Sequence, residues 1–134
     1  MLRLNKLTDY GLLLMAEIAQ NTNLLQAAEL ALSSGIPRPT VAKILQILKQ
    51  NHLLIANTGT AGGYRLAKSA KKITIADIIK AIEGPIAITE CSVENKNCDL
   101  VEHCSIKTPL LNINKAIVNF LESMSLQDLI QTGA

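Results

Sequence analysis

Residues 34–51 read SGIPRPTVAKILQILKQN, and this stretch decides the fold. It opens with Ser34-Gly35, a pair typical of a tight turn. Pro37 and Pro39 follow, and proline is tolerated in the first turn of a helix, where backbone N–H groups have no intrahelical partner. Apolar residues then repeat at helical spacing, at Val41, Ile44, Leu45 and Leu48. The stretch therefore predicts a helix over residues 37–51 that buries one face.

The flanking sequence predicts two helices upstream and a hairpin downstream. Thr8 or Asp9 is expected to cap a first helix that runs to about residue 21, and a short second helix is expected over residues 25–33. After the third helix, short strands at residues 53–56 and 64–67 flank a glycine-rich turn. Two helices joined by a turn and followed by a hairpin form the order of a winged helix-turn-helix. The predicted class is mainly α with a small β-hairpin.

The C-terminal half predicts two helices separated by a polar loop. Thr74 and Asp77 resemble a capping box, and Gly84-Pro85 ends the helix that they open. A long helix is expected over residues 106–123, followed by a turn at residues 126–130. Its apolar stripe consists of Leu110, Ile113, Ile117, Phe120, Leu121 and Met124. One small domain cannot cover so long a stripe, so a homodimer is expected.

The chain accordingly divides into three parts. Residues 1–84 are expected to form the winged helix-turn-helix, residues 85–105 a cysteine loop, and residues 106–134 a dimerisation helix with its tail.

Composition and charge favour a small DNA-binding protein. Of the 134 residues, 49% are hydrophobic but only three are aromatic, which argues against proteins that stack single-stranded bases. No uncharged apolar run approaches the roughly 20 residues of a membrane span, so a cytoplasmic protein is expected. Residues 1–72 hold nine basic and three acidic side chains, a net charge of +6, whereas residues 73–134 hold four and eight, a net charge of −4. Residues 34–72 contain no acid, which favours double-stranded DNA as a partner.

The expected DNA contacts lie on the third helix and on the hairpin. Arg38 is suited to read guanine, and Thr40 to hydrogen-bond a base or contact a thymine methyl group. Lys43 and Lys49 are expected to neutralise phosphates. The full set is Arg38, Thr40, Lys43, Lys49, Thr58, Thr60 and Arg65. A structural hairpin, a solvated basic face, or a winged helix that binds protein are the alternatives.

Three cysteines form a second candidate site. Cys91, Cys98 and Cys104 fall within 14 residues of a polar loop, and there is no other cysteine in the chain. An odd number in a reducing compartment favours metal or redox chemistry over disulfides. Thiolates suit an iron–sulfur cluster or zinc, although both normally require a fourth ligand. Three unrelated free thiols are the alternative.

Together these features resemble the IscR/NsrR-type winged-helix regulators, and most closely the regulators of the SUF iron–sulfur assembly system. The resemblance covers nearly the whole chain. Its motifs are residues 4–10 (LNKLTDY), 37–43 (PRPTVAK), 61–66 (AGGYRL), 77–85 (DIIKAIEGP) and the three cysteines. It implies a homodimer, a cluster in the loop of residues 91–104, and DNA binding tuned by the state of that cluster.

Two positions, Lys107 and Thr58, depart from the IscR-type pattern. Lys107 stands where those regulators carry a histidine ligand, and a charged lysine is not a ligand. Asp9 matches an aspartate that the nitric-oxide-sensing branch uses as a ligand from the partner subunit, although Asp9 also fits as an ordinary acid at a helix N-terminus. Thr58 stands where IscR-type wings carry an arginine that enters the minor groove, so that part of the DNA readout is in question.

The expected function is a homodimeric DNA-binding repressor that senses iron–sulfur status and controls iron–sulfur assembly genes. Its cofactor is either a 2Fe–2S or a 4Fe–4S cluster, and its operator a pseudo-palindrome. The alternative is a repressor that responds to thiol redox state, zinc or nitric oxide. A small cluster carrier or electron-transfer protein is disfavoured, because it predicts four cysteines and needs no basic helix. An enzyme is disfavoured because there is no nucleophile–base arrangement or phosphate loop.

Overall fold

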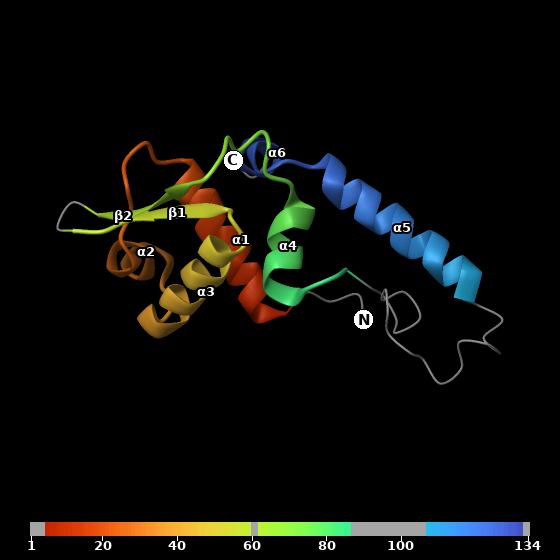
Figure 1. Ribbon diagram of the computed structural model, residues 1–134, viewed down its shortest axis with the longest axis horizontal. Coiled ribbons are helices and arrows are strands. Elements are labelled where there is room, and N and C mark those ends of the chain that lie inside the picture. Colours follow the sequence, from red (N-terminus) through yellow and green to blue (C-terminus); the bar gives the residue numbers. More distant parts are fainter. Residues whose placement is uncertain (1–4, 60–61, 87–106, 133–134) are drawn as a thin grey trace.

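The computed structural model describes residues 5–59, 62–86 and 107–132. Figure 1 shows them as a head of packed helices and one hairpin, from which a single long helix projects. The elements are α1 (Lys6–Ala19), α2 (Ala27–Ser34), α3 (Arg38–Gln50), β1 (Leu54–Asn57), β2 (Gly63–Leu66), α4 (Ile75–Glu83), α5 (Lys107–Ser123) and α6 (Leu126–Thr132). The predicted class and winged helix-turn-helix order are confirmed.

The first helix begins a turn earlier than the sequence predicted. Asn5 is its N-cap, and the Asn5 Oδ1 atom accepts hydrogen bonds from the Thr8 backbone N–H at 2.9 Å and from the Thr8 hydroxyl at 3.0 Å. The prediction that Thr8 or Asp9 caps the helix was therefore wrong. Asn5 is the cap because its side chain accepts from the N–H three residues further on, whereas Thr8 is fully buried within the helix.

An aliphatic core joins α1, α2, α3 and α4. The four residues predicted to form the buried face of α3 are all at 0% exposure. They pack with side chains from the neighbouring helices, including Leu14, Met15, Leu30 and Ile78. Burial of this one face leaves the opposite face of α3 open to solvent.

The hairpin is tied to the linker between α1 and α2. Strands β1 and β2 pair antiparallel, with Ile55 opposite Arg65. Leu25 adds a bridge to the other edge of β2: the Tyr64 N–H donates to the Leu25 carbonyl at 2.8 Å, and the Leu25 N–H donates to the Tyr64 carbonyl at 3.2 Å. Gly63 begins β2 with φ of +154°, and a Cβ there would lie 2.8 Å from the Leu25 carbonyl oxygen.

We expect Gly63→Ala to destabilise the fold by about 1–3 kcal/mol, because both its backbone conformation and the Leu25 backbone oppose a side chain. The free energy of unfolding in urea measures this. Gly59→Ala is the matched control, since Gly59 also has positive φ but no described atom lies within 4 Å of its Cβ position. An equal loss in both variants would contradict the role of the close approach.

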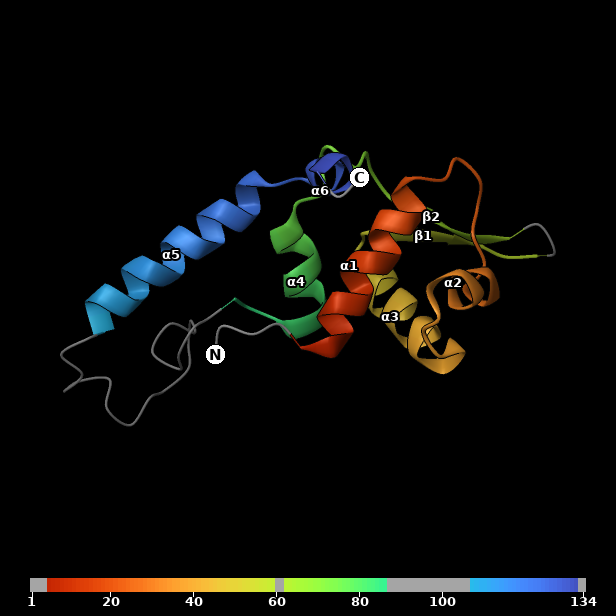
Figure 2. The same ribbon diagram turned by 180° about the vertical axis from the view of Figure 1, so that it is seen from behind.

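The C-terminal segment returns to the head after α5. The Thr74 and Asp77 capping box is confirmed, and the Ile75 N–H at the start of α4 donates to the Met124 carbonyl at 2.9 Å. Met124 therefore lies beyond the end of α5 rather than on its stripe. The segment predicted as a turn is helix α6, whose Leu126 is fully buried. Figure 2 shows α6 against the head while α5 extends away from it.

Among the residues described, no helix has the length and apolar character of a membrane span.

Candidate nucleic-acid interface

The exposed face of α3 carries three of the seven predicted DNA contacts. Arg38 is the first residue of the helix, after an N-cap at Pro37, and its side chain is exposed. Lys43 and Lys49 are exposed one and three turns further along, whereas Thr40 is half-buried. A helix with one buried face and cations on the other has the shape and charge to lie in a major groove.

Helix α2 is held in position by contacts at both its ends. Gln26 and Glu29 form a capping box at the start, and Gly35 adopts φ of +76° after its last residue. The Ser33 hydroxyl donates to the Glu17 carboxylate on α1. The Gly35 conformation and the Ser33 contact lie at the end of α2 that leads into α3.

The hairpin presents fewer of the predicted contacts. Thr58 is exposed near its tip, and Arg65 is exposed on β2. Thr60 lies outside the described residues. Arg65 is the cationic residue in the described part of the hairpin, and its exposed guanidinium is consistent with a phosphate contact.

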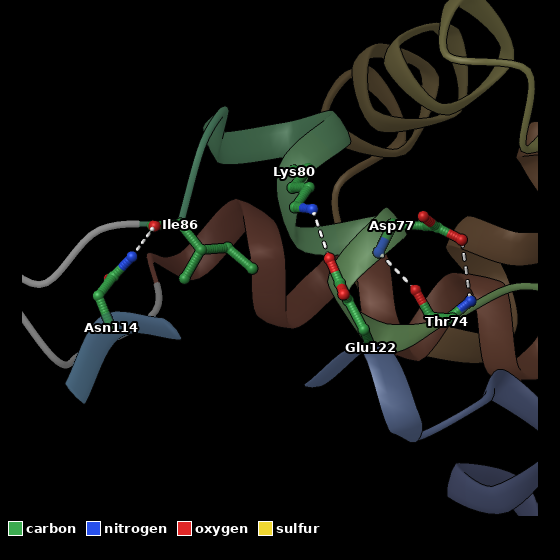
Figure 3. Close-up of polar contacts among 6 residues, drawn as sticks. All are labelled: Thr74, Asp77, Lys80, Ile86, Asn114 and Glu122. Carbon is green, nitrogen blue, oxygen red and sulfur yellow. Dashed lines mark hydrogen bonds and ion pairs between the residues drawn. The ribbon is translucent and has the colours of Figure 1, made fainter. Parts of the chain in front are cut away.

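Polar contacts join α5 to α4 and to the residues that follow α4 (Figure 3). The Lys80 Nζ atom lies 3.0 Å from the Glu122 Oε1 atom, and both side chains are about half exposed. The Asn114 Nδ2 atom donates to the Ile86 carbonyl at 3.1 Å, and Asn114 is only 8% exposed. Ile86, near the start of the cysteine loop, is therefore hydrogen-bonded to α5.

Sequence reasoning missed Asn114, although a signal was present. Leu110, Asn114, Ile117 and Leu121 follow one another at spacings of four, three and four residues, so the asparagine interrupts an apolar row. A polar residue in such a row needs a hydrogen-bond partner when it is buried. The Ile86 carbonyl is that partner.

A second apolar row on α5 remains open. Ile113 is 50% exposed and Phe120 is 64% exposed, and they lie seven residues apart on one side of the helix. The sequence-predicted stripe thus separates into a half-buried row, made of Leu110, Ile117 and Leu121, and a row that faces solvent.

The three cysteines lie within residues 87–106, outside the described residues, so the structure does not place them. Among the residues described, no group of three or more His, Cys, Asp or Glu side chains is gathered as a metal site. The end of α4, which leads toward the cysteines, lies beside the start of α1. The Asn5 N–H donates to the Glu83 Oε1 atom at 3.1 Å, and a Cβ at Gly11 would overlap the Ile82 side chain. Asp9 is exposed near this junction.

Comparisons with known proteins agree with this geometry. The Rrf2 family model, described as an iron-dependent transcriptional regulator, matches residues 4–132. The HTH-type transcriptional regulator NsrR of Oceanobacillus iheyensis is 32% identical over 136 residues, which covers 97% of this chain and 90% of NsrR.

Two solved structures share the whole architecture. CymR, the global cysteine regulator of B. subtilis, has a TM-score of 0.78 at 25% identity and covers 98% of each chain. IscR of T. potens has the same fold, with a TM-score of 0.76 at 23% identity over 99% of this chain and 89% of IscR. Because the family match spans nearly the whole chain, the protein is a member of the Rrf2 family of DNA-binding transcriptional regulators.

Proposed function

We propose that the protein is a homodimeric repressor that senses iron–sulfur cluster status and controls iron–sulfur assembly genes. The observation that carries this proposal is the position of the three cysteines in the sequence, between α4 of the DNA-binding head and the projecting helix α5. A cofactor held there would lie between the part that binds DNA and the part that joins two protomers. In this scheme residues 1–84 bind DNA, residues 85–105 hold the cofactor, and residues 106–134 dimerise.

The head would engage a pseudo-palindromic operator through both copies of α3. Arg38 and Thr40 would contact base edges, while Lys43 and Lys49 would contact phosphates. Arg65 would add a phosphate contact from the hairpin, and Thr58 and Thr60 would offer hydroxyl groups to the backbone. The exposure of Arg38, Lys43 and Lys49 on one helix supports this assignment.

The open apolar row of α5 supports a homodimer. Ile113 and Phe120 are large apolar side chains that the protomer leaves half or more exposed, and a second copy presents the same row by symmetry.

We expect Phe120→Glu to convert the dimer to a monomer, because it places a charge on each side of the interface and removes two aromatic contacts. The cost is about 2 kcal/mol or more for each copy. Light scattering at micromolar concentration measures the mass. Asn119→Glu is the matched control, since it adds the same charge at an exposed polar neighbour. A monomeric wild type, or a Phe120→Glu variant that stays dimeric, would contradict the proposed interface.

The proposed cofactor ligands are Cys91, Cys98 and Cys104, with Asp9 of the partner subunit as the fourth. Three soft thiolates and one hard carboxylate form a donor set that suits iron in a cluster and leaves one position weakly held. A bound cluster supplies a centre that reacts with oxygen or nitric oxide. The exposure of Asp9 leaves its carboxylate accessible to another protomer, and this supports the assignment.

A repressor without a cluster is the second candidate. The likeness to CymR, the global cysteine regulator of B. subtilis, favours a thiol-based signal, whereas the likeness to NsrR favours a cluster. The visible absorption and the iron, sulfide and zinc contents of protein purified without oxygen distinguish them. A colourless protein with zinc, or with no metal, would refute the cluster and leave the thiol or zinc response standing.

A further inference from the structure

Gln46 occupies the middle of the exposed face of α3. The exposed residues of this helix are Arg38, Pro39, Ala42, Lys43, Gln46, Lys49 and Gln50. At about 100° of rotation per residue, they span a sector of about 140°. Gln46 lies near the centre of that sector, with Lys43 about 60° to one side and Lys49 about 60° to the other.

This arrangement matches the cross-section of a major groove. The groove is about 12 Å wide, and a helix with its side chains is about 10–12 Å across. When the exposed face of α3 is directed at the floor of the groove, residues at the edges of the sector meet the two phosphate backbones. Lys43 is at one edge and Lys49 lies near the other, whose outermost residue is Arg38 at the N-terminal end of the helix, while Gln46 is directed at the base pairs.

The amide of Gln46 is also available for an external partner. Two other exposed amides bind carbonyls of their own helices: Gln20 donates to Ala16 at 3.1 Å, and Asn51 donates to Ile47 at 2.8 Å. Within the part of the chain that the structure describes, the side-chain amide of Gln46 forms no hydrogen bond. Its donor and acceptor would then both be free to pair with a base edge.

We propose that Gln46 reads an adenine in the major groove of each operator half-site. This rests on the DNA-binding role proposed above and adds the residue that sets specificity at the centre of α3. A glutamine amide can accept from the adenine N6 amino group and donate to N7, a pairing that no other base edge in the groove offers in the same order. Pro39 and Ala42, exposed on either side, are small and uncharged, so they allow close approach to the bases and suit contact with thymine methyl groups.

The second expected reader, Arg38, lies eight residues before Gln46, or about 12 Å along the helix axis. That is the length of about three to four base pairs at 3.4 Å each. We therefore expect a guanine and an adenine, separated by this interval, as the positions of strongest preference in each half-site.

The test is a selection of randomised DNA duplexes with the full wild-type chain, purified without oxygen, followed by titration of the selected operator and all its single-base-pair variants. In the wild type, we expect replacement of the selected adenine to weaken binding roughly 5- to 150-fold. In Gln46→Ala, this penalty should disappear at that one position, with the other positions unchanged. In Gln46→Glu, the preference should shift toward a pair whose cytosine offers its N4 amino group.

Two controls separate the possible outcomes. Gln131→Ala removes an exposed glutamine from α6 and should leave every preference unchanged. Melting temperature checks that Gln46→Ala is folded. An unaltered preference profile in folded Gln46→Ala, with a specific wild type, would overturn the role of Gln46 and leave the proposed regulator intact. A wild type without any sequence preference would contradict the proposed function, and the role of Gln46 with it.

Discussion

The single substitutions Cys91→Ala, Cys98→Ala and Cys104→Ala should each abolish the visible absorption of the protein purified without oxygen. The reason is that three thiolates in one loop are the only cysteines in the chain, and a cluster that loses one of them keeps too few ligands to persist. Absorption between the near ultraviolet and the visible red, with iron and sulfide analysis, measures the loss. Iron retained at full stoichiometry in the triple alanine variant would eliminate the proposed site.

Asp9→Ala is the informative companion to these variants. It should leave the fold nearly intact, at a cost of about 1 kcal/mol or less, because Asp9 is an exposed acid near a helix N-terminus. If Asp9 of the partner subunit is the fourth ligand, the cluster spectrum or its decay rate in air should still change. An unchanged spectrum and decay rate would move the fourth ligand to Glu90, Glu102, His103 or a small exogenous molecule.

Arg38→Ala and Lys49→Ala should weaken operator binding in two different ways. Arg38→Ala removes a base contact, so it should cost about 1–3 kcal/mol on the cognate site and relax the preference at one position. Lys49→Ala removes a phosphate contact, so it should weaken binding to all sequences alike. Titrations of the operator and of an unrelated duplex measure both effects. If neither variant changed binding to a mapped operator, the placement of α3 in the groove would be wrong.

The salt dependence of DNA binding independently tests whether the basic residues of α3 and the hairpin contact phosphates. Lys43, Lys49 and Arg65, doubled by the proposed dimer, suggest about six phosphate contacts and a slope near −5 in log K against log salt concentration. Lys49→Ala in both protomers should make the slope less steep by about 2, whereas a variant that loses only base contacts should keep it. A slope that Lys49→Ala leaves unchanged would remove this lysine from the interface.

Local patterns predicted the elements that short-range physics decides. The buried face of α3 follows from apolar spacing, and all four of its predicted residues are fully buried. The capping box of Thr74 and Asp77 is also local, because both hydrogen bonds join residues three positions apart. For the same reason Gly84, which was expected to end α4, adopts the positive φ that glycine permits.

Features that depend on distant parts of the chain were not predictable. Asn5, Thr8 and Asp9 are all acceptable caps by residue type, but in the assembled head Asn5 accepts from the Thr8 N–H and Thr8 is fully buried. The bridge between Thr74 and Ser125, which holds the start of α6 beside α4, joins residues about fifty positions apart. The hydrogen bond from Asn114 to Ile86 likewise spans 28 positions. No local periodicity encodes such contacts, even where a polar residue in an apolar row signals that a partner exists.

The candidate site was predictable to a different degree in its two halves. Basic residues on an amphipathic helix were expected to be exposed together, and Arg38, Lys43 and Lys49 are. The central position of Gln46 could be identified only after the exposure of each residue of α3 was known. Spacing alone does not tell which residues are exposed, and so does not tell which of them lies in the middle. The cysteines and Thr60 lie outside the described residues, so their assignment still rests on residue type and spacing.

The central claim is that the state of a cluster on the cysteine segment sets the affinity for DNA. The direct measurement is the affinity of one preparation for its selected operator, without oxygen, before and after removal of the cluster by an iron chelator. The account predicts a difference of about 5- to 150-fold, the usual range of coupling between two sites. Equal affinities for the two forms, in a protein shown to carry the cluster and to remain dimeric, would contradict it.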